Sequence, residues 1–249
     1  MRIIFAALLV ISLFIPAPLS ADEKTLSTSE KNALLDKVVE QNPFFEILIS
    51  DSKKFRKSWL KELTKLQDDK PDGDAESLAI EAGASIAMDE VNHYLAKADD
   101  AAVNKYFSFY ADLMAYSLKD EALCTYLIED KSAEVEKQRR DIVDQKYSAE
   151  WIPKMVQALS GVITSGNTGE TQLLAEDKYT EALVDVMKRA SENHGISVLQ
   201  RATEIDDPTI PARRQCETMS WLFETINELP PIDKAMLVRT MFSDVDKDK

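Results

Sequence analysis

The sequence predicts an all-α protein, a compact domain of about eight to ten helices that follows a cleavable signal peptide. After the N-terminal segment, apolar residues recur at the three- and four-residue spacing of helices, and sustained alternation with a period of two is hard to find. The chain holds 6 Gly and 9 Pro among 249 residues, too few for the many turns of an all-β sandwich. Its 45% hydrophobic content argues against intrinsic disorder.

The N-terminus has the layout of an export signal. Arg2 precedes an uncharged apolar run at residues 3–15, and small residues at 16–21 lead into a charged segment. This pattern predicts a signal peptide at residues 1–21 and a mature chain of residues 22–249. The apolar run spans roughly 20 Å as a helix, short of the roughly 30 Å hydrocarbon core of a membrane. No later segment is long and apolar enough to cross a membrane, so we expect no transmembrane segment in the mature chain.

Three helical segments are expected in the first part of the mature chain. The first opens at Ser29 and stops near Pro43, and an amphipathic segment follows at residues 44–66. After a polar turn, a long helix runs from Asp74, which can act as its N-cap, toward Ala98. Small residues spaced by four on this helix would let another helix approach closely: Ala79, Gly83 and Ala87.

The middle of the chain should supply the centre of the core. Asp99 and Asp100 can cap the most aromatic helix of the sequence. Its apolar side chains are Tyr106, Phe107, Phe109, Tyr110, Leu113, Met114 and Tyr116. The pattern continues at residues 119–129, and the charged run at 130–145 is typical of a solvated helix. Residues 151–163 form the next apolar stretch.

A flexible loop is expected near residues 161–170, where three Gly occur among Ser, Thr and Asn. A long helix then covers residues 170–193 and ends at Gly195, a typical C-terminal cap. The remaining predicted helices cover residues 196–205, 213–229 and 232–242, the last two pairing as a hairpin, before an acidic tail at 243–249. We expect residues 22–249 to form a single helical domain.

The two cysteines predict a disulfide. An even number of cysteines in an exported chain usually forms bridges, and here Cys124 and Cys216 are the pair. Each also lies on an apolar helical stripe, so two separate buried thiols are the alternative. The chain contains no Asn-x-Ser/Thr acceptor, which favours a bacterial periplasmic or secreted protein over a eukaryotic secretory one.

No complete catalytic motif occurs in the sequence. Residues 161–168 match a phosphate-binding loop, except that Asn167 occupies the position of the essential Lys. The Ser-x-x-Lys motifs at Ser50 and Ser58 lack the Lys-Thr-Gly strand of penicillin-recognising enzymes. A Ser-His-Asp triad has only His93 and His194 available, without a nucleophile elbow. We therefore assign no catalytic residue and expect no cofactor.

Metal ligands are not clustered in the sequence either. Glu90 and His93 share a helical face, as in one half of a di-iron site, but the second Glu-x-x-His is absent. The acidic turn around Gly73 lacks oxygen ligands at two positions of a calcium loop, and the terminal acidic residues end before completing one. We predict no metal site.

Basic residues gather on one amphipathic segment of an acidic protein whose net charge is −14. They are Lys53, Lys54, Arg56, Lys57, Lys61 and Lys65, opposite an apolar stripe of Phe55, Trp59, Leu63 and Leu66. Such a helix suits an acidic protein groove or peripheral contact with an anionic surface. The simpler interpretation is a core-facing stripe with a solvated basic face. The strong negative charge of the whole chain speaks against nucleic-acid binding.

The function predicted by exclusion is an exported, non-enzymatic helical binding protein that engages another envelope protein as an inhibitor, immunity protein or assembly factor. Two alternatives remain open. One is an envelope hydrolase that uses two carboxylates on cell-wall glycans, since 44 acidic residues include many possible pairs. The other is a helical carrier of an apolar ligand, with Phe107, Tyr110 and Met114 as wall residues.

Overall fold

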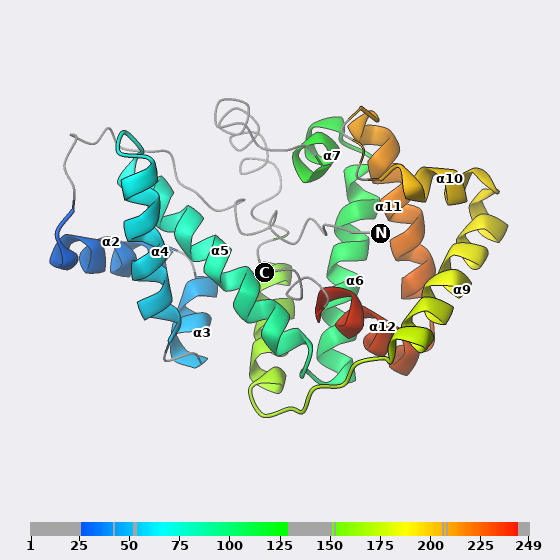
Figure 1. The fold of residues 1–249 in the computed structure, drawn as a ribbon, viewed down its shortest axis with the longest axis horizontal. Coiled ribbons are helices and arrows are strands. Elements are labelled where there is room, and N and C mark those ends of the chain that lie inside the picture. Colours follow the sequence, from blue (N-terminus) through cyan, green and yellow to red (C-terminus); the bar gives the residue numbers. More distant parts are fainter. Residues whose placement is uncertain are drawn as a thin grey trace. The chain divides into compact units, whose positions relative to one another are not determined.

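The chain is all-α in the computed structural model (Figure 1). The structure describes residues 26–41, 43–51, 54–128, 151, 153–205, 207 and 209–243. Within these ranges every regular element is a helix, and there are eleven, slightly more than the eight to ten expected. The predicted signal peptide, Lys53, the charged run at 130–145 and residues 244–249 of the acidic tail lie outside the described residues. No helix in the described ranges is both long and apolar enough to cross a membrane.

The chain divides into two compact units at the boundary between His93 and Tyr94, near the end of helix α5. We call residues 26–93 the N-terminal unit and residues 94–243 the C-terminal unit, and describe each by itself. The expectation of a single domain over residues 22–249 stays a prediction.

The N-terminal unit begins with three helices and most of a fourth, namely α2 (Thr28–Gln41), α3 (Pro43–Asp51), α4 (Phe55–Asp69) and α5 (Ala75–Leu95). The segment predicted at 44–66 is therefore two helices instead of one. Asp74 caps α5 as expected, because its carboxylate accepts a 2.8 Å hydrogen bond from the backbone N–H of Ser77.

Aromatic rings fill the core of this unit. Phe45 packs against both Phe55 and Trp59, with ring centroids 6.3 and 4.5 Å away, and all three side chains are fully buried. The Trp59 indole N–H donates a 2.6 Å hydrogen bond to the carbonyl of Ala79, and a Cβ atom on Gly83 would lie 2.7 Å from the Trp59 ring. The small residues of α5 thus leave room for the Trp59 ring of α4 to pack closely against α5, as the sequence predicts.

Most of the C-terminal unit packs around one aromatic helix. Its helices are α6 (Asp100–Ser117), α7 (Glu121–Ile128), residues 153–166, α9 (Glu176–His194), α10 (Ser197–Thr203), α11 (Ala212–Asn227) and α12 (Pro231–Ser243). The expected caps are present, since Asp99 accepts from the Ala102 N–H and Gly195 has φ of 91°. Helices α11 and α12 both pack mainly against α6, instead of forming the close hairpin that the sequence suggested. Figure 1 shows α6 beside both helices.

The segment expected as a loop at 161–170 is helical up to Gly166, and the irregular part covers residues 167–175. A Cβ atom on Gly166 would clash with the Tyr94 carbonyl oxygen, and one on Gly169 would clash with that of Lys97. The backbone N–H of Gln172 also donates to the carbonyl of Ala96. These glycines therefore serve close backbone packing, which composition alone cannot distinguish from a loop signal.

Candidate functional site

The candidate site is the basic face of α4. Lys54, Lys57 and Lys61 are exposed, and we call them the lysine row. At about 100° per residue they fall within an arc of about 60°, because Lys54 continues the helical backbone conformation by one residue. The row lies roughly opposite the buried stripe of Phe55, Trp59 and Leu63, each with no exposed surface.

The lysine row forms no ion pair with another described residue. Within the described part of the chain, Lys54, Lys57 and Lys61 take part in none of the ion pairs that the structure forms. Three ammonium groups therefore face solvent side by side in a protein whose net charge is −14. Holding like charges together without partners costs stability, and an acidic partner would relieve that cost.

Arg56 has a different role from the row. Its guanidinium donates a 2.6 Å hydrogen bond to the Asp36 carboxylate, a 3.1 Å bond to the carbonyl of Asn32 and further bonds to the Asn32 side chain. These contacts fasten α4 to α2. Of the predicted interaction residues, Arg56 is thus committed to the fold.

Lys65 stands at the margin of the basic face. Its ammonium lies 3.2 Å from the Glu62 carboxylate, in an i, i+3 pair on the same helix. The pair neutralises Lys65 in part, although its side chain stays 66% exposed and solvent weakens the attraction. The structure therefore separates three unpaired lysines from two paired basic residues, while Lys53 lies outside the described residues.

The apolar stripe of α4 is unavailable to a membrane. A helix that binds an interface inserts its apolar face among the lipid chains. Here Phe55 and Trp59 are already packed against each other, with ring centroids 5.5 Å apart, and Trp59 is also bonded to α5. In the folded unit the apolar face of α4 is therefore buried, whereas its basic face is exposed.

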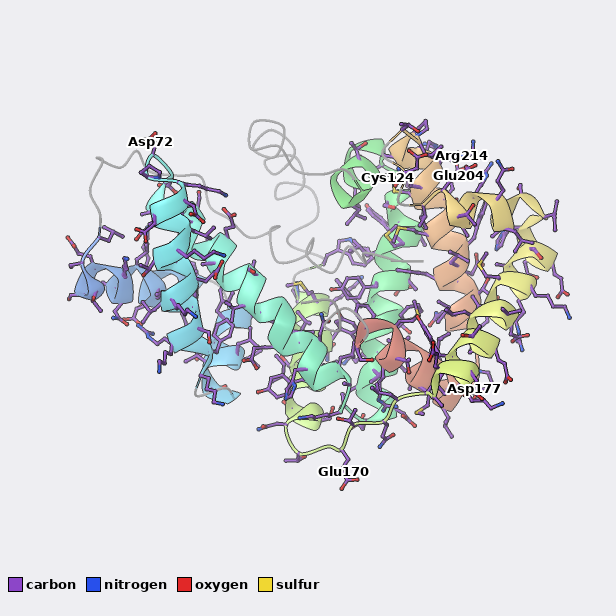
Figure 2. The ribbon with its side chains drawn as sticks, in the orientation of Figure 1. Asp72, Cys124, Glu170, Asp177, Glu204 and Arg214 are labelled. Carbon is purple, nitrogen blue, oxygen red and sulfur yellow. A yellow bond between two sulfur atoms is a disulfide. The ribbon has the colours of Figure 1, made fainter. Side chains whose placement is uncertain are left out.

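The two cysteines are brought together in the C-terminal unit. Their sulfur atoms lie 2.10 Å apart and their Cα atoms 6.0 Å apart, across a sequence separation of 92 residues. Figure 2 shows Cys124 on α7 beside α11. Both side chains are buried, at 1% and 0% exposure, so the pair has the setting of a structural crosslink.

The residues proposed as walls of a ligand carrier belong to a packed core. Phe107 lies 5.2 Å from the Phe223 ring, and Tyr110 contacts Tyr106 and Phe109 at 4.8 and 5.3 Å. Met114 is 3% exposed. Burial raises the pKa of the Tyr110 hydroxyl to about 12, in keeping with an interior site.

The motifs that resembled catalytic sites lie on ordinary helices. Residues 161–166 of the incomplete phosphate loop are helical, where a phosphate loop needs a turn after a strand. In the described ranges, no group of three His, Cys, Asp or Glu side chains is placed to hold a metal ion. Two hydrogen bonds from Thr209 lower the pKa of the Asp207 carboxyl, opposite to the shift that a general acid requires.

Sequence reasoning missed two features of the C-terminal unit. Arg239 is fully buried in α12, and His194 and Arg201 both lie against the Trp221 ring at 5.1 Å. The basic residue among the apolar side chains of α12 was the available signal for the first. The second joins three helices and had no local signal.

Comparison with protein-family models, with curated proteins and with solved structures finds no match to this chain.

Proposed function

We propose that this protein is an exported, non-enzymatic binding protein that docks on an acidic surface of another envelope protein through its lysine row. The observation that carries the proposal is the set of three exposed, unpaired ammonium groups of Lys54, Lys57 and Lys61 on a rigid helix. Complementary charge speeds encounter and orients the partners, and in a chain whose net charge is −14 the exposed lysine row sets the orientation in which an acidic surface is attracted.

The position of the row suits docking. Trp59 and Phe55 fix α4 from behind, and Arg56 fixes it from the side, so the lysines lie on a backbone that need not be ordered on binding. A preorganised site avoids part of the entropy cost of association. Inhibitors, immunity proteins and assembly factors all act by occupying a partner's surface in this manner.

The first experiment is native mass spectrometry on the mature protein, residues 22–249, purified without refolding from its own envelope. We expect a stoichiometric protein partner that dissociates as the salt concentration rises. A bare protein that cleaves cell-wall fragments, or one that carries a lipid, would overturn the proposal in favour of the hydrolase or the carrier.

The second experiment assigns the surface. The triple variant Lys54→Gln, Lys57→Gln, Lys61→Gln should lose at least about tenfold in affinity for that partner, since each ion pair contributes a modest amount. The matched control replaces Lys105, Lys178 and Lys188 by Gln, which are exposed lysines of the C-terminal unit, and reaches the same net charge. Equal losses in both variants would show that net charge alone matters and would refute docking through the row.

A further inference from the structure

The lysine row has a different neighbour along each of its two edges. On one edge α2 lies against α4, because Arg56 bonds Asp36 and the Lys31 ammonium donates a 3.0 Å hydrogen bond to the Thr64 hydroxyl. On the other edge lies Lys65, and beyond it Glu62, whose side chain is 24% exposed and pairs with Lys65. The positive strip is therefore narrow and is bordered by a carboxylate of its own helix.

The Glu62 carboxylate is close enough to the lysine row to affect a bound anion at physiological ionic strength. Screening at physiological ionic strength limits exposed charges to about 8 Å, so the charges that a bound group senses most are those of the row and its immediate neighbours. A ligand with carboxylates confined to one line meets only the lysines. A broad anionic surface would also bring charge against Glu62 and against the acidic remainder of the protein.

The axial spacing of the row's backbone positions matches a partner helix better than a strand. Along the axis of α4, Lys54 and Lys57 are about 4.5 Å apart and Lys57 and Lys61 about 6 Å apart. These are the intervals of residues three and four apart on another helix. A strand spaces its same-face residues about 6.7 Å apart, so its third carboxylate would lie about 3 Å beyond Lys61.

We infer that the lysine row binds a narrow acidic stripe on a helix of the partner, with carboxylates at positions i, i+3 and i+7, and that Glu62 selects against broader polyanions. The inference rests on the proposed function and adds the partner's chemistry to it. It assigns Glu62 to specificity, although its carboxylate makes only an ordinary surface ion pair.

The test uses two helical peptides of identical composition and net charge. One carries three Glu at i, i+3 and i+7, and the other carries them spread around the helix. Fluorescence anisotropy with the full mature chain should give at least about fivefold tighter binding of the striped peptide, and this preference should vanish in the triple Lys→Gln variant. Polyglutamate and phosphatidylglycerol vesicles should bind more weakly than the stripe.

Glu62 is tested by a pair of variants that break the same ion pair. Glu62→Gln removes the border charge and should improve polyglutamate binding about threefold, leaving the striped peptide within twofold. Lys65→Gln leaves the border charge in place and should not improve polyglutamate binding. Circular dichroism of each variant checks that the helices are retained.

The outcomes separate the inference from the function it rests on. The spread peptide, polyglutamate or the vesicles could bind as tightly as the striped peptide while the lysines remain necessary. In that case the inferred acidic stripe is wrong and docking through the row stands. If Glu62→Gln and Lys65→Gln behave alike, the role of Glu62 is wrong. If the natural partner is retained by the triple variant, the proposed function itself fails.

Discussion

The contacts that stabilise each unit differ in sequence separation. In the N-terminal unit, the side-chain contacts that fasten α2, α4 and α5 join residues 20 to 39 positions apart, as in Trp59 to Ala79 and Lys37 to Glu76. In the C-terminal unit they span far more, with 141 positions between Arg239 and Ala98 and 92 between the cysteines. The N-terminal unit is thus assembled from neighbours in sequence, and the C-terminal unit from its two ends.

The difference extends to the kind of contact. In the N-terminal unit the two ion pairs that join helices keep both partners at least partly exposed, with 44% and 12% for Lys37 and Glu76 and 31% and 61% for Arg56 and Asp36. The C-terminal unit buries a guanidinium completely: Arg239 donates to the Ala98 carbonyl through Nε and Nη2, and to the Asp100 carboxylate at 2.7 Å. Closing a long loop costs more chain entropy, and removing a buried guanidinium leaves the groups that accept from it without a donor. We therefore expect single changes to damage the C-terminal unit most.

The largest effect is expected at the disulfide. Replacing Cys124 and Cys216 by Ala should lower the free energy of unfolding of the C-terminal unit by up to about 4 kcal/mol, because the crosslink restrains a long loop. Hydrogen exchange should show lost protection in α11 and little change in α4. Denatured wild-type protein should contain no free thiol. An equal loss of protection in α4 would mean that the two units unfold together, which would contradict the proposed difference between them.

Arg239 should rank next. Arg239→Met leaves the Asp100 carboxylate and the Ala98 carbonyl without their donor, and we expect a loss of about 3 kcal/mol in urea unfolding. Arg56→Met removes an exposed pair in the N-terminal unit and should cost about 1 kcal/mol or less. Similar losses in the free energy of unfolding for the two variants would show that burial does not set the strength of these arginine contacts.

Alkaline pH should destabilise the C-terminal unit through its buried tyrosines. Burial raises the pKa of Tyr110 to about 12, from an ordinary value near 10, and raises that of Tyr106 well above it. A raised folded-state pKa stabilises fully below pH 10, and this contribution is lost between about pH 10 and 12, up to about 3 kcal/mol for Tyr110. Tyr110→Phe should flatten that loss. Residues 26–93 contain no Tyr, so α4 provides the internal control.

Effects smaller than those of the disulfide and Arg239 are expected from two glycine substitutions, and they should differ in sign. Gly169→Ala forces a Cβ atom against the Lys97 carbonyl and should cost about 2 kcal/mol. Gly161→Ala, in the same helix as Gly166, meets its nearest neighbour at an ordinary 3.8 Å and should stabilise by about 0.5 kcal/mol. Thermal unfolding measures both. A cost at Gly161 would place a loop there after all.

Local patterns predicted the helices well, and their failures have a common cause. The caps at Asp74, Asp99 and Gly195 are each a contact within a few residues, so the sequence displays them directly. The prediction of a loop at residues 161–170 was wrong in part, because Gly166 and Gly169 are needed for close packing against the backbone of residues 94–97, which are distant in sequence. A glycine in the sequence can indicate close packing, but it does not identify the segment that packs against it.

The candidate site divides in the same way. The sequence alone determined that α4 has a basic face opposite an apolar one, since helical geometry fixes which residues share a side. Only the tertiary structure decided which cations are free to bind. Arg56 is taken up by α2 and Lys65 by Glu62, whereas Lys54, Lys57 and Lys61 point away from the core. A charge is available for a partner only when packing brings no counter-charge to it, and packing is a property of the whole fold.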